Sequence, residues 1–438
     1  MFKLAELVRS HTDELAGIIT KEQGKTLADA RGDVFRGLEV VEAACGVGNH
    51  LLGEHLENVS TDVDTYTLRQ PLGVCAGICP FNFPAMIPLW MFPLALATGN
   101  TFVLKPSERV PSAAVRLAQL AMEAGVPPGV LNVVHGTHTA VNFLTSAPEI
   151  QAVSFVGGDA AGKHVAERCA THGKRFQCNQ GAKNHAVVMP DAHPRATAAA
   201  LVGAAFGAAG QRCMAVSVAV LVGDCSAVVA EVQALTRGLV LGHGGEEGTD
   251  VGPVISPASK ARIEGLLASA VAQGATMAVD GAEAVAALPA RLRGGNFVGP
   301  TVLTGITQGS PAYSTEVFGP VLLCMAAPTL EAALEIANAS PYGNGAAIFT
   351  QSGAAARSFV SRVSCGQVGV NIPIPVAMPY FSFTGWKGSF NGNLHFYGKQ
   401  GVDFFTRTKT VTTTWKATDS VKGKHKAQTS FPTSKPTV

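Results

Sequence analysis

The 438-residue sequence lacks any run of apolar residues long enough to cross a membrane. A membrane-spanning helix needs roughly 18 or more consecutive apolar residues. Residues 85–97 come closest, but Pro88 and Pro93 interrupt them. Proline inside a helix removes a backbone donor and disturbs the preceding turn. The sequence therefore predicts no membrane partner.

A strong charge of one sign is also absent. Charged residues make up 15% of the chain and the formal net charge is +2, so nothing global draws the protein to nucleic acid. The tail after Trp415 is basic and low in apolar residues, and we expect residues 417–438 to be disordered. Because Phe431 is the only aromatic residue in that tail, a nucleic-acid partner is not expected.

The cysteines form no pattern typical of disulfides or zinc. They number nine, which is odd, and they are scattered over a long chain. This favours reduced thiols in a reducing compartment. Cys75 and Cys79 lie near one another, but no second Cys or His pair stands at zinc spacing, so we predict no metal site.

What the sequence does contain is a repeated alternation of strand-like and helix-like segments. Residues 1–57 have helical spacing, with Gly24, Lys25 and Thr26 separating two helices, and residues 65–72 are strand-like. The alternation then follows as strand 73–78, helix 84–98, strand 101–104, helix 111–124, strand 130–134, helix 138–146, strand 151–155 and helix 160–172. Strands separated by helices predict an α/β fold with a parallel, doubly wound sheet. Ligands bind such sheets beyond the carboxyl ends of their strands.

A second α/β run begins near residue 186. It continues through a strand at 215–222, a helix at 226–237 and a helix at 259–273. We place a boundary near residue 184, although no Pro- or Ser-rich linker marks it.

Residues 203–214 are the most informative segment because small residues there lead to Arg212 and Cys213. A thiol acts in catalysis as its thiolate, and a neighbouring cation lowers its pKa. We therefore expect Cys213 to be a nucleophile; a buried helix with an inert cysteine is the alternative. Asn82, between Phe81 and Phe83, could donate to a developing oxyanion together with the backbone N–H of Cys213. An ordinary turn asparagine is the alternative.

Several segments suit a nucleotide. Lys105 and Glu108 follow a strand where ribose and adenine would lie, and residues 155–162 end a strand in glycines that open a helix toward a pyrophosphate. Glu316 could hold a ribose hydroxyl, and Phe318 could pack on a nicotinamide ring. Taken singly, each has a structural alternative: a solvated charged loop for the first, weak evidence for the glycines, and a loop acid with a core Phe for the last.

Arg36 and Arg212 are candidate clamps for a substrate carboxylate, since guanidinium groups bind carboxylates in bidentate fashion. For Arg36, a surface salt bridge is the alternative.

Together these motifs resemble the aldehyde dehydrogenase superfamily, and within it the CoA-acylating, methylmalonate-semialdehyde branch. The resemblance runs from about residue 2 to Trp415. It rests on PFNFPAMIPLWMFP at 80–93, GNTF at 99–102, KPSER at 105–109, GAKNH at 181–185, residues 203–214 and GQVGVN at 366–371.

The resemblance implies how the chain is divided. We expect a Rossmann-like NAD domain at 1–184 with oligomerisation strands inserted at 58–70, a catalytic α/β domain at 185–398, and a return to an oligomerisation strand at 399–416. A homotetramer in the mitochondrial matrix is the family expectation, with the cytoplasm as the alternative. The family's opening segment is missing, so either the start is truncated, with a presequence lost, or the form is unusual.

The resemblance also implies roles for single residues. Cys213 is then the nucleophile, Asn82 the oxyanion donor, and Arg36 and Arg212 the substrate clamp. The implied cofactor contacts are Cys79, Phe81, Lys105, Glu108, Arg109, Gly158, Glu316 and Phe318. The implied reaction is NAD-dependent oxidation of methylmalonate and malonate semialdehyde, with loss of the carboxylate, to propionyl-CoA and acetyl-CoA, as in valine and pyrimidine catabolism.

Two departures bear on this reaction. Hydrolytic members of the superfamily carry a Glu where this chain has Asn179, which cannot accept a proton at neutral pH. An acyl-enzyme would then wait for a thiol such as CoA. Gly158 stands where a Ser usually touches the phosphate. The alternatives are a hydrolytic aldehyde dehydrogenase that uses another base and an inactive, truncated isoform.

Overall fold

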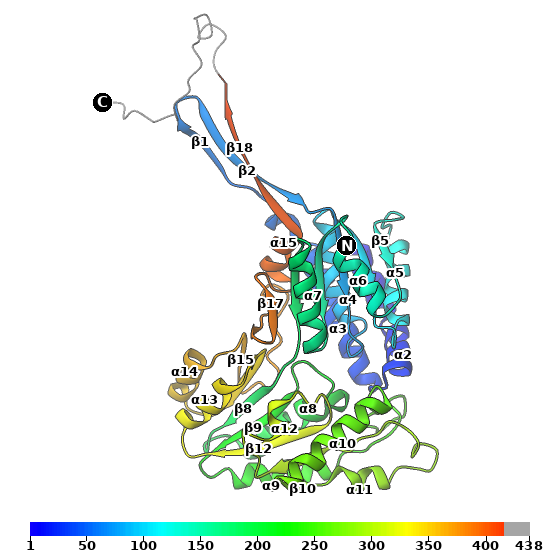
Figure 1. Cartoon of the computed structure of the whole chain (residues 1–438), viewed down its shortest axis with the longest axis vertical. Coiled ribbons are helices and arrows are strands. Elements are labelled where there is room, and N and C mark those ends of the chain that lie inside the picture. Colours follow the sequence, from blue (N-terminus) through cyan, green and yellow to red (C-terminus); the bar gives the residue numbers. More distant parts are fainter. Residues whose placement is uncertain (416–438) are drawn as a thin grey trace, which may run out of the picture.

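The computed structural model describes residues 1–415, so the predicted disorder of residues 417–438 falls outside the described residues. Two α/β bodies and a projecting three-stranded arm make up this part of the chain (Figure 1). No helix within it is long and apolar enough to cross a membrane.

Three helices, where two were expected, open the chain: α1 (Phe2–Ser10), α2 (Thr12–Gln23) and α3 (Leu27–Ala44). The extra break falls at His11, where the His11 ring and the Ser10 hydroxyl both bond the Leu7 carbonyl oxygen. Such side-chain bonds compete with the helical backbone pattern. At the predicted break, Gly24 ends α2 in the left-handed conformation, and the Thr26 hydroxyl accepts from Asp29 N–H to begin α3.

The first sheet is parallel and doubly wound, as predicted, with strand order β17-β7-β6-β3-β4-β5. Its strands are β3 (Val74–Ile78), β4 (Thr101–Lys105), β5 (Leu131–Val133), β6 (Ile150–Val156), β7 (Arg175–Asn179) and β17 (Phe390–Gly392). Its helices are α4 (Met86–Ala97), α5 (Ser112–Glu123), α6 (His138–Ser146) and α7 (Asp159–Thr171). Helices α4 and α5 share a core with α1–α3, whereas α6 and α7 pack in a separate core.

The second sheet has strand order β10-β11-β12-β9-β8-β14-β15, and only its edge strand β10 is antiparallel. Its strands are β8 (Asn184–Val188), β9 (Val216–Val222), β10 (Thr276–Val279), β11 (Thr301–Thr304), β12 (Val321–Ala327), β14 (Gly345–Phe349) and β15 (Gln367–Val370). Its helices are α8 (Pro194–Phe206), α9 (Ser226–Arg237), α10 (Pro257–Ala272), α11 (Gly281–Ala286), α12 (Pro311–Ser314), α13 (Leu330–Ala339) and α14 (Gly353–Arg362). Its buried strands form one large apolar core.

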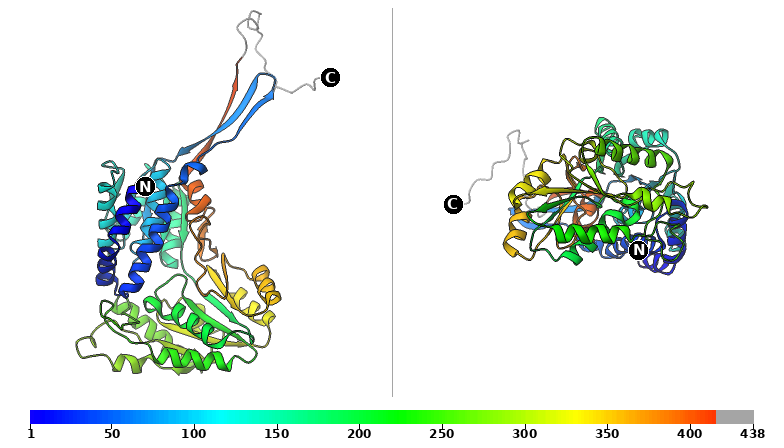
Figure 2. Two further views of the ribbon diagram at one scale, coloured as in Figure 1. Left: turned by 180° about the vertical axis from the view of Figure 1, so that it is seen from behind. Right: turned by 90° about the horizontal axis from the view of Figure 1, so that it is seen from below.

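The arm consists of β1 (His55–Ser60), β2 (Val63–Pro71) and β18 (Thr406–Thr414), all antiparallel. It projects from the first body in both side views (Figure 2). β18 pairs with β2 along its whole length, and β1 is exposed throughout. Segments that lie more than 300 residues apart in the chain thus meet in one sheet.

The chain passes from the first sheet to the second between β7 and β8. It has returned to the first sheet before residue 398, because β17 pairs antiparallel with β7, and α15 (Gly398–Phe405) then packs on α4. The expected second segment, 185–398, therefore extends too far at its end. β17 is only three residues long and contains a glycine, so its sequence carries no strand periodicity.

Candidate active site

A cavity of about 850 Å³ lies at the carboxyl ends of the first sheet's strands, where a doubly wound sheet is expected to bind a ligand. Ile78 at the end of β3, Lys105 at the end of β4 and Val156 at the end of β6 all line it. From the second body, Cys213 and Glu316 close its inner end.

A tight loop after α8 positions Cys213. Ala208, Ala209 and Gly210 follow one another with φ of 52°, 54° and 69°, in the left-handed region. A Cβ on Gly210 would lie 2.0 Å from the carbonyl oxygen of Gly319, so only glycine fits there. After the loop, the Cys213 carbonyl oxygen accepts from the side-chain amides of Asn184 at 2.8 Å and Asn344 at 3.1 Å.

The Cys213 thiol is not activated in this resting structure. Burial raises its pKa to about 12, and the charge of Glu316 adds to the shift. Arg212 and the backbone N–H groups of Cys213 and Met214 act in the opposite direction but do not offset it. The expectation that a neighbouring cation lowers the pKa is wrong for this state, because the Arg212 side chain pairs with Asp29.

Asn82 lies in the same cavity and is buried. Its Nδ2 donates one hydrogen bond to the Gln211 carbonyl oxygen at 2.9 Å, and an amide nitrogen carries two hydrogens. Gln211 in turn holds the loop on its other side, since its Oε1 accepts from Ile255 N–H at 2.9 Å. The amide of Asn82 is thereby fixed two residues from Cys213.

Seven of the eight predicted cofactor contacts line this cavity: Cys79, Phe81, Lys105, Glu108, Gly158, Glu316 and Phe318. Arg109 does not; it is exposed. Lys105 donates to the carbonyl oxygens of Pro106 at 2.8 Å and Gly136 at 2.9 Å, and lies 3.8 Å from a Glu108 oxygen. Burial lowers the pKa of Lys105.

Gly158 is the residue before α7, in extended conformation, and no side chain caps the helix. The first N–H groups of a helix lack intrahelical partners and suit a phosphate. A Cβ at Gly158 would meet no atom within 4 Å, so this position is open.

Glu316 and Lys183 form a buried ionisable pair beside Cys213. Burial raises the pKa of Glu316 to about 7, against the opposing effects of Ala182 N–H, Lys183 and Arg262. Burial likewise lowers the pKa of Lys183 to about 7. Phe318 has a φ of 48°, and its ring meets Phe81 edge to face, with centroids 5.9 Å apart.

Several lining residues were not predicted from the sequence, among them Ser107, Thr137, His138, His164, Gln180, Ser259 and Arg262. They come from separate elements, and no local motif marks them. Asn179, the position that departs from hydrolytic enzymes, also lines the cavity, and its Nδ2 donates to Asn344 Oδ1 at 3.1 Å.

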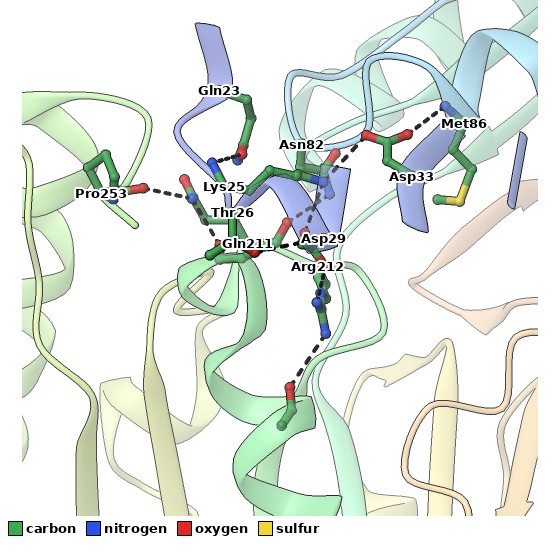
Figure 3. A network of polar contacts seen from close by, with 12 residues as sticks. Gln23, Lys25, Thr26, Asp29, Asp33, Asn82, Met86, Gln211, Arg212 and Pro253 are labelled. Carbon is green, nitrogen blue, oxygen red and sulfur yellow. Dashed lines mark hydrogen bonds and ion pairs between the residues drawn. The ribbon is translucent and has the colours of Figure 1, made fainter. Parts of the chain in front are cut away.

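The two arginines lie outside the large cavity, and each is paired with an acid. Arg36 on α3 donates to Glu39 at 2.9 Å, and Arg212 pairs with Asp29 on the same helix (Figure 3). Tyr397 connects them with the thiol: burial raises its pKa, and the charges of Cys213, Arg36 and Glu39 also act on it.

Comparison with known proteins agrees with this geometry. A model of the aldehyde dehydrogenase family matches residues 1–411. A mitochondrial, acylating methylmalonate-semialdehyde dehydrogenase from Arabidopsis thaliana is 57% identical over 95% of this chain and 68% of its own. The human methylmalonate-semialdehyde/malonate-semialdehyde dehydrogenase, also acylating and mitochondrial, is 51% identical over 96% and 78%. A Sinorhizobium meliloti protein solved in complex with NAD is 45% identical, with a TM-score of 0.92 over 95% of this chain and 84% of its own.

Proposed function

The chain belongs to the aldehyde dehydrogenase family, and we propose that it oxidises malonate semialdehyde and methylmalonate semialdehyde with NAD, transferring the acyl group to CoA. The products are acetyl-CoA and propionyl-CoA, with loss of the substrate carboxylate. The observation that carries this proposal is that Cys213 and Asn179 line one cavity. A thiol nucleophile thus stands opposite an amide that cannot act as a base.

Cys213 acts as the nucleophile on the aldehyde carbon. Its pKa of about 12 means that the resting thiol is protonated, so the proton is lost during the reaction cycle. Asn82 stabilises the oxyanion with the N–H that Gln211 does not use, together with the backbone N–H of Cys213. Because Asn82 is buried and fixed to Gln211, its amide is oriented before the substrate arrives.

NAD fits the cavity by size and by its donor set. Small-molecule and cofactor sites span roughly 300–1,000 Å³, and this one is about 850 Å³. We assign the ribose and adenine end to Lys105 and Glu108, the pyrophosphate to the start of α7 at Gly158, and the nicotinamide end to Glu316 and Phe318. When bound, NAD accepts the hydride from the thiol adduct. The exposure of Arg109 gives no support to its predicted contact.

The thioester on Cys213 persists until CoA arrives. The Asn179 amide has no proton-accepting nitrogen, and its hydrogen bond to Asn344 holds it in place. A thiol attacks a thioester more readily than water that no base has activated. The same cavity then accounts for transfer to CoA instead of hydrolysis.

Arg36 and Arg212 hold the substrate carboxylate until it leaves. The carbon–carbon bond to the carboxylate breaks, its electron pair passes into the enolate of the thioester, and a proton then adds to the α carbon. A carboxylate β to a thioester carbonyl can leave in this way. The arginines must bind it without over-stabilising the ground state.

Assignments for the larger parts of the chain follow from the same family. We assign cofactor binding to the first body, the nucleophile to the second, and homotetramer formation to the arm, whose edge strands β1 and β18 are exposed. Exposed strand edges are ready to pair with another chain. The mitochondrial names of the relatives favour that compartment for this protein.

The deciding experiment is NADH formation from malonate semialdehyde with and without CoA, with product identification. Sustained turnover only with CoA, giving acetyl-CoA, is the expected result. Turnover without CoA to a free acid would identify a hydrolytic enzyme, and no NADH in either case would identify an inactive form. Cys213→Ser is the negative control and should abolish turnover.

A further inference from the structure

Each arginine assigned to the substrate carboxylate already holds a carboxylate of this chain. Arg212 pairs with Asp29, and Arg36 pairs with Glu39 at 2.9 Å. Both acids lie on α3, one near its beginning and one in its second half. A substrate carboxylate must therefore compete with, or share, an acid that is built in.

The Asp29 side of this arrangement is a closed polar network (Figure 3). Lys25 is almost fully buried and lies 3.3 Å from Asp29 and 3.4 Å from Asp33. Asp33 accepts from Met86 N–H at 2.7 Å, next to the loop that carries Asn82. Lys25 and Arg212 together outweigh the effect of burial and lower the pKa of Asp29, so Asp29 is ionised at neutral pH.

The Glu39 side is simpler and more open. The Arg36 side chain is 42% exposed and that of Glu39 is 13% exposed. Arg36 also contacts the sulfur of Met378 at 3.9 Å. Glu39 can therefore be changed without disturbing a buried network, which makes it the cleaner of the two positions to test.

Charges balance across the whole set. Lys25, Arg212 and Arg36 carry three positive charges, and Asp29, Asp33 and Glu39 carry three negative ones when ionised. The two arginines thus offer directed N–H groups with no excess positive charge. This suits a carboxylate that must bind and then leave as neutral CO2, since excess attraction would stabilise the bound substrate more than the transition state.

We propose that Asp29 and Glu39 are positioning residues that weaken the hold of Arg212 and Arg36 on the substrate carboxylate and so favour its loss. This inference rests on the proposed function, because it concerns the same substrate. The two acids touch neither substrate nor cofactor; they act through the arginines. Removing one should tighten binding of carboxylated aldehydes and slow decarboxylation.

The test compares Glu39→Gln and Asp29→Asn with Asp13→Asn. Asp13 pairs with Arg31 at 2.7 Å on the surface, so this control removes an acid from an arginine elsewhere. KM and kcat are measured for malonate semialdehyde and for propanal, which has no carboxylate. Glu39→Gln should lower KM for malonate semialdehyde about threefold, as expected for a partly exposed pair. It should also lower kcat for CO2 release, and leave KM for propanal unchanged.

Asp29→Asn should act in the same direction and more strongly, but it also disturbs Lys25, so its folding is checked by thermal melting. A KM for malonate semialdehyde that rises in Glu39→Gln, or that shifts equally for propanal, would overturn the inference. Either result would mean that the acid orients the arginine without weakening it.

A binding measurement separates this inference from the proposed function. Malonate, which carries no aldehyde, is used to protect Cys213 from alkylation by iodoacetamide. Tighter protection in Glu39→Gln than in the wild type or Asp13→Asn supports the inference even if turnover with CoA fails. Equal or weaker protection overturns it even if turnover succeeds.

Discussion

Asn179 donates its Nδ2 hydrogen to Oδ1 of Asn344 at 3.1 Å, and Asn344 donates in turn to the carbonyl oxygen of Cys213 at 3.1 Å. The residue that decides between water and CoA is therefore joined to the nucleophile through one side chain. Both asparagines are almost fully buried. The link fixes Asn179 as a donor toward Asn344, which leaves its carbonyl oxygen as the remaining polar atom.

Asn179→Glu should convert the enzyme toward hydrolysis. A carboxylate at this position can accept a proton from water, and general-base catalysis contributes roughly 10²–10⁴-fold. We expect NADH formation without CoA and a free acid as product. Asn179→Gln is the matched control, because it lengthens the side chain without adding a base. Equal CoA-independent rates in both variants would show that the charge is not the cause.

Alkylation of Cys213 by iodoacetamide should accelerate steeply with pH in the protein without cofactor. Its pKa of about 12 lies far above neutral, so the thiolate fraction rises about tenfold per pH unit between 7 and 9. The modified residue is identified by mass spectrometry of the Cys213 peptide. A rate that levels off below pH 8 would mean that the thiol is already activated.

The Glu316 and Lys183 pair should give stability a minimum near pH 7. Glu316 has its folded pKa raised from 4.5 to about 7, so the native state holds the extra proton and stability falls as pH rises across that range. Lys183 has its folded pKa lowered from 10.5 to about 7, so its contribution is present above 10.5 and lost as pH falls to 7.

Thermal melting from pH 4.5 to 10 tests this pair. Glu316→Gln should flatten the acid limb relative to the wild type, and Lys183→Met should flatten the alkaline limb. Asp33, whose pKa burial raises to about 6, contributes in the same direction as Glu316 and is unchanged in both variants. Parallel melting curves in all three proteins would contradict the assignment.

The sequence predicted local structure better than it predicted the chemistry of the site. Strands such as β4 and β6, and helices such as α6 and α9, fall within a residue or two of their expected ranges, because periodicity and turn residues are local signals. β17 was missed because three residues carry no period. The resemblance to aldehyde dehydrogenases, confirmed by the family match, brought distant motifs together that no spacing rule could join.

The failures at the site have a common physical reason. The pKa of Cys213 depends on burial and on where the Arg212 side chain turns, and both are set by residues such as Asp29, far away in the sequence. Arg109 matched a motif, yet its side chain is exposed outside the cavity. Adjacency in the sequence therefore did not determine which charges act on the thiol.

Gly210→Ala should disable the nucleophile loop. Gly210 has a φ of 69°, and an added Cβ would lie 2.0 Å from the Gly319 carbonyl oxygen and 2.4 Å from its carbonyl carbon. Because these are backbone atoms of the segment that carries Phe318, the loop or that segment must shift. Backbone strain of this kind costs roughly 1–3 kcal/mol, and a displacement of about 1 Å can cost on the order of 100-fold in rate.

Gly203→Ala is the matched control for that variant. It lies in α8, just before the same loop, and its added Cβ would meet nothing within 4 Å. Alanine favours a helix over glycine by about 1 kcal/mol, so this variant should melt slightly higher and keep full activity. We expect Gly210→Ala to lose most CoA-dependent NADH formation and to melt lower. If both variants behave alike, the left-handed turn at Gly210 is not what positions Cys213.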